Sequence, residues 1–297
     1  MNVSLGSFEP ERVTYYPEGT VAVGHIGPDS APVWVCTPND YSSDDGSKDF
    51  VAAIGLLARP EQYLRLGQVL MSDHDRLVVF GHDHHHHKWP IRANAADIVA
   101  GVHELELEHF TAIGHSMGTL AVLLAMEDEA FAASTDMVVQ SDPAMTGSHL
   151  AYGIKDVYNM GREATVLTKK YPKDAFRYVA SAVGEYWHRP LVIGNQVLRL
   201  ASGKVHGRYN ELMLKHPDKK FTIIFNHNDG LVPENWSESM RGPNLVVYIH
   251  DSVTGLAHAA INVDDEVGHA VHALANNQKT PDSFHLIFDG SRSKIAA

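Results

Sequence analysis

A serine stands between two glycines in the segment AIGHSMGTL, residues 112–120, in the pattern Gly-x-Ser-x-Gly with Ser116 at its centre. The apolar run HFTAI leads into it, and a helical pattern follows it. A sharp turn from strand to helix exposes a serine hydroxyl at the end of a sheet, beside the N–H groups that begin the helix. Those groups stabilise a developing oxyanion, so the pattern predicts a nucleophilic serine. The other interpretation is a serine that only caps a helix at a tight turn.

A serine hydroxyl is a poor nucleophile at neutral pH and needs a base, which in turn needs an orienting carboxylate. For a serine at a strand-to-helix turn, the expected order along the chain is Ser, acid, His. Asp229 follows the strand-like run FTIIFN in a turn rich in Asn and Gly, and His258 lies in the loop after LVVYIH. These two residues are therefore the candidate acid and base.

Two alternatives to this assignment stay open. Asp142, in QSDPA after an earlier strand-like run, is a rival acid, although Pro143 after it favours an extended exit from the strand. Asp229 could instead be a turn aspartate that bonds its own main chain. The chain has 20 histidines, so a histidine alone means little; His269 and His272 fall on a helical pattern and are expected at the surface or in packing.

The segment GHDHHHHKWP, residues 81–90, holds five histidines within six positions, His82 and His84 to His87. Histidine is a common metal ligand, but a dedicated zinc site needs ligands of fixed geometry and a second layer of hydrogen bonds. Adjacent histidines on one loop do not provide these. The run is therefore expected to be a solvated or substrate-adjacent loop, and we expect no functional metal.

Strand-like and helical patterns alternate along most of the chain. Strand-like runs occupy residues 20–26, 32–37, 49–55, 76–80, 109–113, 136–140, 221–226 and 245–250. Helical spacing appears at residues 60–71, 94–107, 117–130 and 264–276. Such alternation predicts a mostly parallel sheet covered by helices on both faces, that is, a doubly wound α/β fold. Between residues 144 and 218 helical spacing replaces the strand rhythm, which predicts a helical insert.

Composition restricts the class of protein further. The chain has 297 residues, 44% hydrophobic, which is enough for a large buried core. Its single cysteine, Cys36, has no internal disulfide partner, which is typical of a reducing compartment. The beginning of the sequence has neither a basic start nor an apolar stretch typical of a secretory signal, and no apolar run reaches membrane-spanning length. A cytoplasmic location is therefore expected.

The net charge of −12, with histidine neutral, disfavours nucleic acid and anionic membranes as partners, since both select clustered Lys and Arg. A small-molecule substrate is the expected partner. The sequence leaves the oligomeric state open.

The candidate residues Ser116, Asp229 and His258 and the segments around them resemble the α/β-hydrolase family, in its lid-bearing, esterase-like branch. The resemblance extends over nearly the whole length of the chain. Residues 50–83 are similar to that branch's third strand, oxyanion turn, first helix and fourth strand, and residues 96–118 to its approach to the nucleophilic serine. The segments HNDGLVP (227–233) and GLAH (255–258) resemble its acid and histidine loops. The resemblance implies a hydrolase core of residues 1–143 and 219–297, with residues 144–218 as a helical lid inserted between later strands.

The resemblance also implies roles for the residues. Ser116 is the nucleophile, His258 the general base and acid, and Asp229 orients His258. The main-chain N–H groups of Met117 and Leu56 form the oxyanion hole. No cofactor is implied.

Two positions depart from the family pattern. Ile54 stands where the family usually has a histidine, and Thr119 where a second glycine is frequent, but neither change removes a catalytic group. The expected function is hydrolysis of a small, mostly apolar ester, thioester or lactone through an acyl-enzyme. Hydrolytic cleavage of a C–C bond by the same residues, and a non-catalytic ligand receptor of the same fold, are the alternatives.

Overall fold

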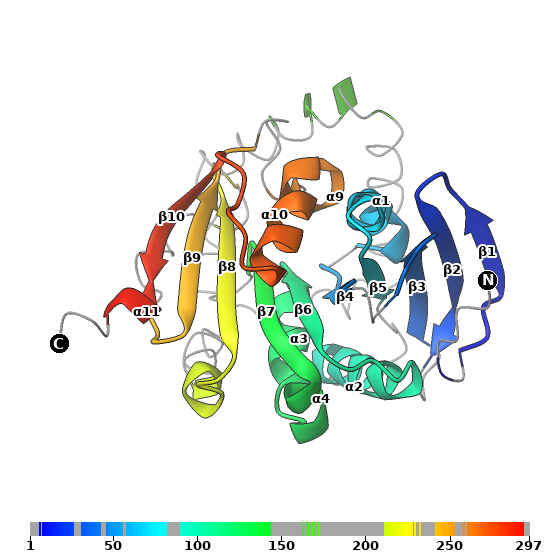
Figure 1. Cartoon of the computed structure of the whole chain (residues 1–297), viewed down its shortest axis with the longest axis horizontal. Coiled ribbons are helices and arrows are strands. Elements are labelled where there is room, and N and C mark those ends of the chain that lie inside the picture. Colours follow the sequence, from blue (N-terminus) through cyan, green and yellow to red (C-terminus); the bar gives the residue numbers. More distant parts are fainter. Residues whose placement is uncertain are drawn as a thin grey trace.

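A large twisted sheet forms the centre of the computed structural model (Figure 1). The structure describes residues 8–26, 31–42, 46–55, 58–81, 90–143, 211–227, 241–252 and 260–293, and the single residues 6, 162, 165, 166, 168, 169, 172, 229, 232 and 258. In the described residues the sheet has ten strands. They are β1 (Arg12–Tyr15), β2 (Gly19–Ile26), β3 (Ala31–Pro38), β4 (Asp49–Ala53), β5 (Arg76–Phe80), β6 (Phe110–His115), β7 (Thr135–Ser141), β8 (Lys220–Asn226), β9 (Leu245–His250) and β10 (Phe284–Asp289).

The spatial order of the strands is β1-β2-β3-β5-β4-β6-β7-β8-β9-β10. The six strands from β5 through β9 in this order are parallel to one another, whereas β1, β2, β3 and β10 pair antiparallel with their neighbours. All the residues of β4, β5 and β6 are buried, because helices cover both faces of a parallel sheet. The predicted α/β class with a mostly parallel, doubly wound sheet is confirmed.

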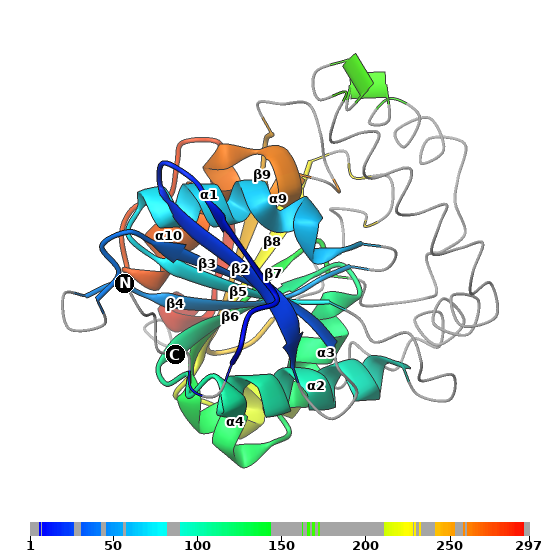
Figure 2. The ribbon, with the colours of Figure 1, turned by 90° about the vertical axis from the view of Figure 1, so that its right-hand side faces the viewer.

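Helices lie in two layers against the sheet (Figure 2). The upper layer in that view contains α1 (Leu64–Ser72), α9 (Ala260–Val263) and α10 (Asp265–Ala275), and the lower layer contains α2 (Pro90–Glu104), α3 (Gly118–Ala125) and α4 (Glu129–Ser134). A short 3₁₀ helix, η2 (Pro60–Tyr63), leads into α1, and α11 (Gly290–Ser293) follows β10. Each layer buries its own apolar core against one face of the sheet.

One helix predicted from the sequence is two helices in the structure. The pattern of residues 117–130 predicts one helix, but α3 ends at Ala125 and α4 begins at Glu129. Asp128 causes the second start, since its carboxylate accepts the N–H groups of Ala130 and Phe131. An aspartate bonded in this way is a favourable N-cap.

The first and last strands were not among those predicted. All four residues of β1 are exposed, and β10 exposes Leu286 and Ile287 beside a register shift. Neither strand shows the buried, apolar pattern of a central strand. Most of the predicted insert, residues 144–218, lies outside the described residues, so its boundaries remain a prediction. Among the helices that the structure describes, none is long and apolar enough to span a membrane.

Candidate active site

Ser116 lies at the tight turn that joins β6 to α3. Its φ angle is +51°, a left-handed conformation that is uncommon for any residue other than glycine. Its N–H donates to Ser141 O at 3.0 Å, which fixes the turn against β7. The sequence permits this close packing because a Cβ on Gly118 would lie 2.1 Å from the carbonyl oxygen of Ala53 in β4.

His258 and Asp229 are joined by a hydrogen bond of 2.8 Å between Nδ1 and Oδ2. Both residues are buried. A carboxylate only accepts hydrogen bonds, so Nδ1 carries the proton and Nε2 keeps a lone pair, which is the tautomer that a general base requires. The other carboxylate oxygen of Asp229 accepts the N–H of Val232 at 3.1 Å, so both oxygens are held.

The sheet brings these two residues together. Strands β8 and β9 pair in parallel, with Asn226 opposite His250 at their carboxyl ends. Asp229 lies three residues beyond Asn226, and its N–H donates to Asn226 O at 3.2 Å. The loops that follow neighbouring parallel strands meet at one edge of the sheet. The same edge holds Ser116, which follows β6.

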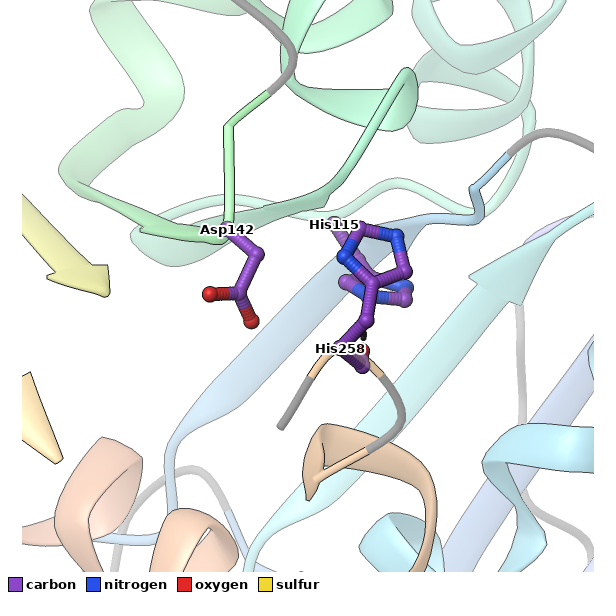
Figure 3. A group of neighbouring side chains, drawn as sticks. All are labelled: His115, Asp142 and His258. Carbon is purple, nitrogen blue, oxygen red and sulfur yellow. Dashed lines mark hydrogen bonds between the residues drawn. The ribbon is translucent and has the colours of Figure 1, made fainter. Parts of the chain in front are cut away.

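Asp142, the rival acid, lies directly after β7 and has no exposed surface. Its Oδ1 accepts the main-chain N–H of Asn226 at 2.9 Å, and its Oδ2 accepts the side-chain amide of Asn226 and the hydroxyl of Ser141. Figure 3 shows its carboxylate directed toward the space beside His115 and His258. Asp229 is therefore the carboxylate that bonds the His258 imidazole, whereas Asp142 bonds Asn226.

The expectation of an extended exit at Asp142 is wrong. Its φ angle is +46°, in the left-handed region, although Pro143 follows it. The two hydrogen bonds from Asn226 hold the residue in this conformation, and aspartate tolerates it better than most residues. Burial, and then the negative charge of Asp229, raise the pKa of Asp142 well above its ordinary value.

His115, immediately before Ser116, is a residue of the site that the sequence did not single out. Its Nδ1 lies 2.6 Å from the hydroxyl of Tyr63, and its Nε2 lies 2.9 Å from the carbonyl oxygen of His258. Burial, followed by the nearby imidazole of His258, lowers the pKa of His115 to about 3, so the ring is neutral at neutral pH. His115 falls inside the Gly-x-Ser-x-Gly motif, but a motif does not reveal its partners. Tyr63 falls within the helical spacing of residues 60–71, which does not indicate its partners either.

Of the two predicted oxyanion-hole donors, Met117 lies among the described residues and Leu56 does not. Met117 is the N-cap of α3, and the first N–H groups of a helix have no acceptor within the helix. Leu56, the second predicted donor, lies outside the described residues. Gly55 before it packs against the turn, since a Cβ at Gly55 would lie 3.2 Å from Ser116 Cβ. Thr119 fits beside the sheet because Gly114 has no side chain; a Cβ there would lie 2.6 Å from Thr119 Cα.

His115, Asp142 and His258 are spaced as metal ligands could be, with one ligand atom from each within 4.8 Å of the others (Figure 3). Each of these side chains already makes hydrogen bonds within the protein, and both nitrogens of His115 are engaged. This is the donor set of an ordered hydrogen-bond network rather than of an open metal site. The histidine run 82–87 lies outside the described residues, and its role remains a prediction.

Several solved structures have a similar arrangement of elements. Est816, an N-acyl homoserine lactone degrading enzyme, aligns with a TM-score of 0.57 and 11% identity over 84% of this chain and 99% of its own. An esterase from Exiguobacterium antarcticum aligns with a TM-score of 0.57 and 12% identity over 86% and 98%. A putative lipase from Acinetobacter baumannii aligns with a TM-score of 0.59 and 11% identity over 84% and 88%.

No protein-family model matches the sequence, and no curated protein matches it either. Three-dimensional similarity over most of the chain, at 11 to 12% identity, nevertheless establishes the fold. The chain has the α/β-hydrolase fold, as its sequence resemblance implied. The fold is shared with an esterase, a protein described as a putative lipase and a lactone-degrading enzyme, and function must be argued from the site itself.

Proposed function

We propose that this protein is a serine hydrolase that cleaves a small, mostly apolar carboxylic ester, thioester or lactone. The observation that carries the proposal is the hydrogen bond between Asp229 and His258, formed at the same edge of the sheet as the strained turn of Ser116. These are the three components of nucleophilic acyl transfer, in the chain order typical of this fold. The ester, thioester or lactone class is supported by the names of the structures that share the fold.

In the proposed reaction Ser116 Oγ attacks the carbonyl carbon, and its proton passes to Nε2 of His258. The tetrahedral oxyanion accepts a hydrogen bond from the N–H of Met117, with Leu56 as the proposed second donor. The bond to the leaving alcohol or thiol then breaks, and His258 returns the proton to it. Water attacks the acyl-enzyme by the same route, and Ser116 regains its proton. Asp229 stabilises the imidazolium throughout.

Replacement of Ser116 by Ala tests this function. We expect hydrolysis of p-nitrophenyl esters to fall by a factor on the order of 10⁶, because the triad acts as a unit and water replaces the nucleophile poorly. The melting temperature should change little, since alanine keeps the Cβ that the turn already accommodates. The Ala variant should also lose covalent labelling by a serine-directed phosphonate.

A Ser116→Ala variant that keeps most of its esterase activity would contradict the proposal. A wild-type protein that neither hydrolyses the esters nor reacts with the phosphonate would instead favour a non-catalytic receptor. Turnover of a β-diketone without ester hydrolysis would favour C–C bond cleavage by the same residues.

A further inference from the structure

A buried chain of hydrogen bonds connects three segments of the candidate site that lie far apart in the sequence. Gly55 N donates to the Tyr63 hydroxyl at 3.1 Å, the hydroxyl lies 2.6 Å from His115 Nδ1, and His115 Nε2 lies 2.9 Å from His258 O. Tyr63 and His115 are both buried, and their rings meet edge to face at 5.9 Å.

The direction of every bond in this chain follows from chemistry. The carbonyl of His258 only accepts, so His115 Nε2 must donate to it. The second nitrogen of a neutral imidazole is then an acceptor, and the Tyr63 hydroxyl donates its proton to that nitrogen. The hydroxyl oxygen in turn accepts the N–H of Gly55. The donors and acceptors of these hydrogen bonds therefore match at each contact, from Gly55 to His258.

The chain reaches the main chain beside each component of the proposed machinery. Gly55 precedes Leu56, the proposed oxyanion donor. His115 precedes the proposed nucleophile Ser116. The carbonyl that accepts from His115 belongs to the proposed base, His258, whose ring lies 5.1 Å from that of His115 (Figure 3). Asp229 bonds the imidazole of His258, and His115 bonds the main-chain carbonyl of the same residue.

We propose that Tyr63 and His115 are positioning residues that fix the main chain of His258 and of Gly55 relative to the Ser116 turn. The inference rests on the proposed serine hydrolase function. Acyl transfer depends steeply on geometry, and a displacement of about 1 Å can lower the rate on the order of 100-fold. The hydroxyl of Tyr63 and the imidazole of His115 would therefore govern kcat without contacting substrate.

Replacement of Tyr63 by Phe removes the two hydrogen bonds of its hydroxyl and keeps the ring. Tyr41→Phe is the matched control, because the Tyr41 hydroxyl donates to Asp49 at 2.9 Å at the opposite end of β4 from Gly55. We expect both variants to melt at a lower temperature than the wild type. Only Tyr63→Phe should lower kcat for p-nitrophenyl acetate, by about 10- to 100-fold with little change in KM.

Variants of His115 give a second, independent comparison. Glutamine at position 115 carries one acceptor and one donor at nearly the spacing of the two imidazole nitrogens, so it can accept from Tyr63 and donate to His258. Leucine can do neither. We expect His115→Gln to keep kcat within a few-fold of the wild type, and His115→Leu to lose it about as strongly as Tyr63→Phe does.

Phosphonate labelling separates failure of this inference from failure of the proposed function. A wild-type protein that is not labelled and does not hydrolyse esters would overturn the function itself. An active wild type whose Tyr63→Phe and His115→Leu variants keep full kcat, with only a lower melting temperature, would show that the chain is merely structural. If His115→Gln loses as much activity as His115→Leu, the hydrogen bonds are not what matters, and the inference is also wrong.

Discussion

At the scale of single residues, two carboxylates lie close to the His258 imidazole, and their hydrogen bonds give them different functions. Asp229 bonds the imidazole directly, whereas both oxygens of Asp142 accept hydrogen bonds from Asn226. The negative charge of Asp229 helps to raise the pKa of Asp142, which disfavours two charged carboxylates side by side. The charge that stabilises an imidazolium is therefore expected on Asp229.

Asparagine substitutions at the two positions test this division. We expect Asp229→Asn to lower kcat on the order of 10⁴-fold, because an amide can favour the wrong imidazole tautomer and carries no charge. Asp142→Asn should lower kcat much less and mainly lower the stability. An asparagine side chain has only one oxygen, so it cannot accept both of the hydrogen bonds that Asn226 donates to the Asp142 carboxylate. Both variants are compared on one ester at one pH. The reverse ranking would transfer the acid to Asp142.

The sequence indicated Ser116, Asp229 and His258 as candidates but not their supporting partners, for a physical reason. Ser116, Asp229 and His258 each follow an apolar strand-like run, and the ends of parallel strands share one edge of a sheet. Tyr63 and His115 are 52 positions apart, and nothing in the local pattern of either indicates the other. Leu56 falls outside the described residues, so its role stays a prediction.

At the scale of elements, the position of the serine turn depends on how closely α3 approaches β4. Gly118 begins α3, and the nearest atom to a Cβ placed on it is the carbonyl oxygen of Ala53, only 2.1 Å away. That atom belongs to the main chain of a buried strand between β5 and β6, and it cannot move aside easily. The glycine therefore sets the distance between the two elements.

Gly118→Ala should move α3 away from β4 and displace Ser116, two residues earlier. We expect destabilisation of about 1–3 kcal/mol from overpacking, together with a clear loss of kcat. Asp128→Ala is the control, because it removes the N-cap of α4 at a cost of about 1 kcal/mol without contact to the site. Urea unfolding and ester hydrolysis are measured on both. Equal activity in the two variants would mean that the turn tolerates the shift.

Central elements were predicted more accurately than peripheral ones. Eight apolar runs correspond to β2 through β9. The pattern is strongest in the parallel strands β4 through β8, because buried parallel strands must be apolar on both faces. At the rim, β1 and β10 pair on one side only and face solvent, so their sequences carry a weaker pattern. The division between α3 and α4 depends on a single side chain, Asp128, within an otherwise continuous helical pattern.

At the scale of the whole molecule, the buried neutral His115 makes the stability of the fold depend on pH. Its pKa falls from the usual value of about 6.5 in an unfolded chain to about 3 in the folded protein. Between these two pH values the unfolded chain binds one proton more. This group therefore contributes stability that is present above pH 6.5 and is lost as the pH falls toward 3.

Comparison with His115→Gln isolates that contribution, since glutamine does not titrate. As the pH falls below 6.5, we expect the wild type to lose about 1.4 kcal/mol of unfolding free energy per pH unit relative to the variant. Other groups, such as His74 with its pKa raised by Asp40, are present in both proteins and cancel in the difference. Urea unfolding at pH 7, 6 and 5 measures it. Parallel pH profiles for the two proteins would show that His115 titrates normally.

The pairing of β7 with β8 has an evolutionary consequence. Met137 lies opposite Lys220 and Ser141 opposite Ile224, although a long stretch of chain separates the two strands in sequence. The entropy of closing such a connection grows only logarithmically, by about 0.6 kcal/mol for each doubling of its length. A lineage can therefore lengthen, shorten or exchange this stretch while the paired strands keep their register. Insertions and deletions in this stretch therefore need not disturb the pairing of the two strands.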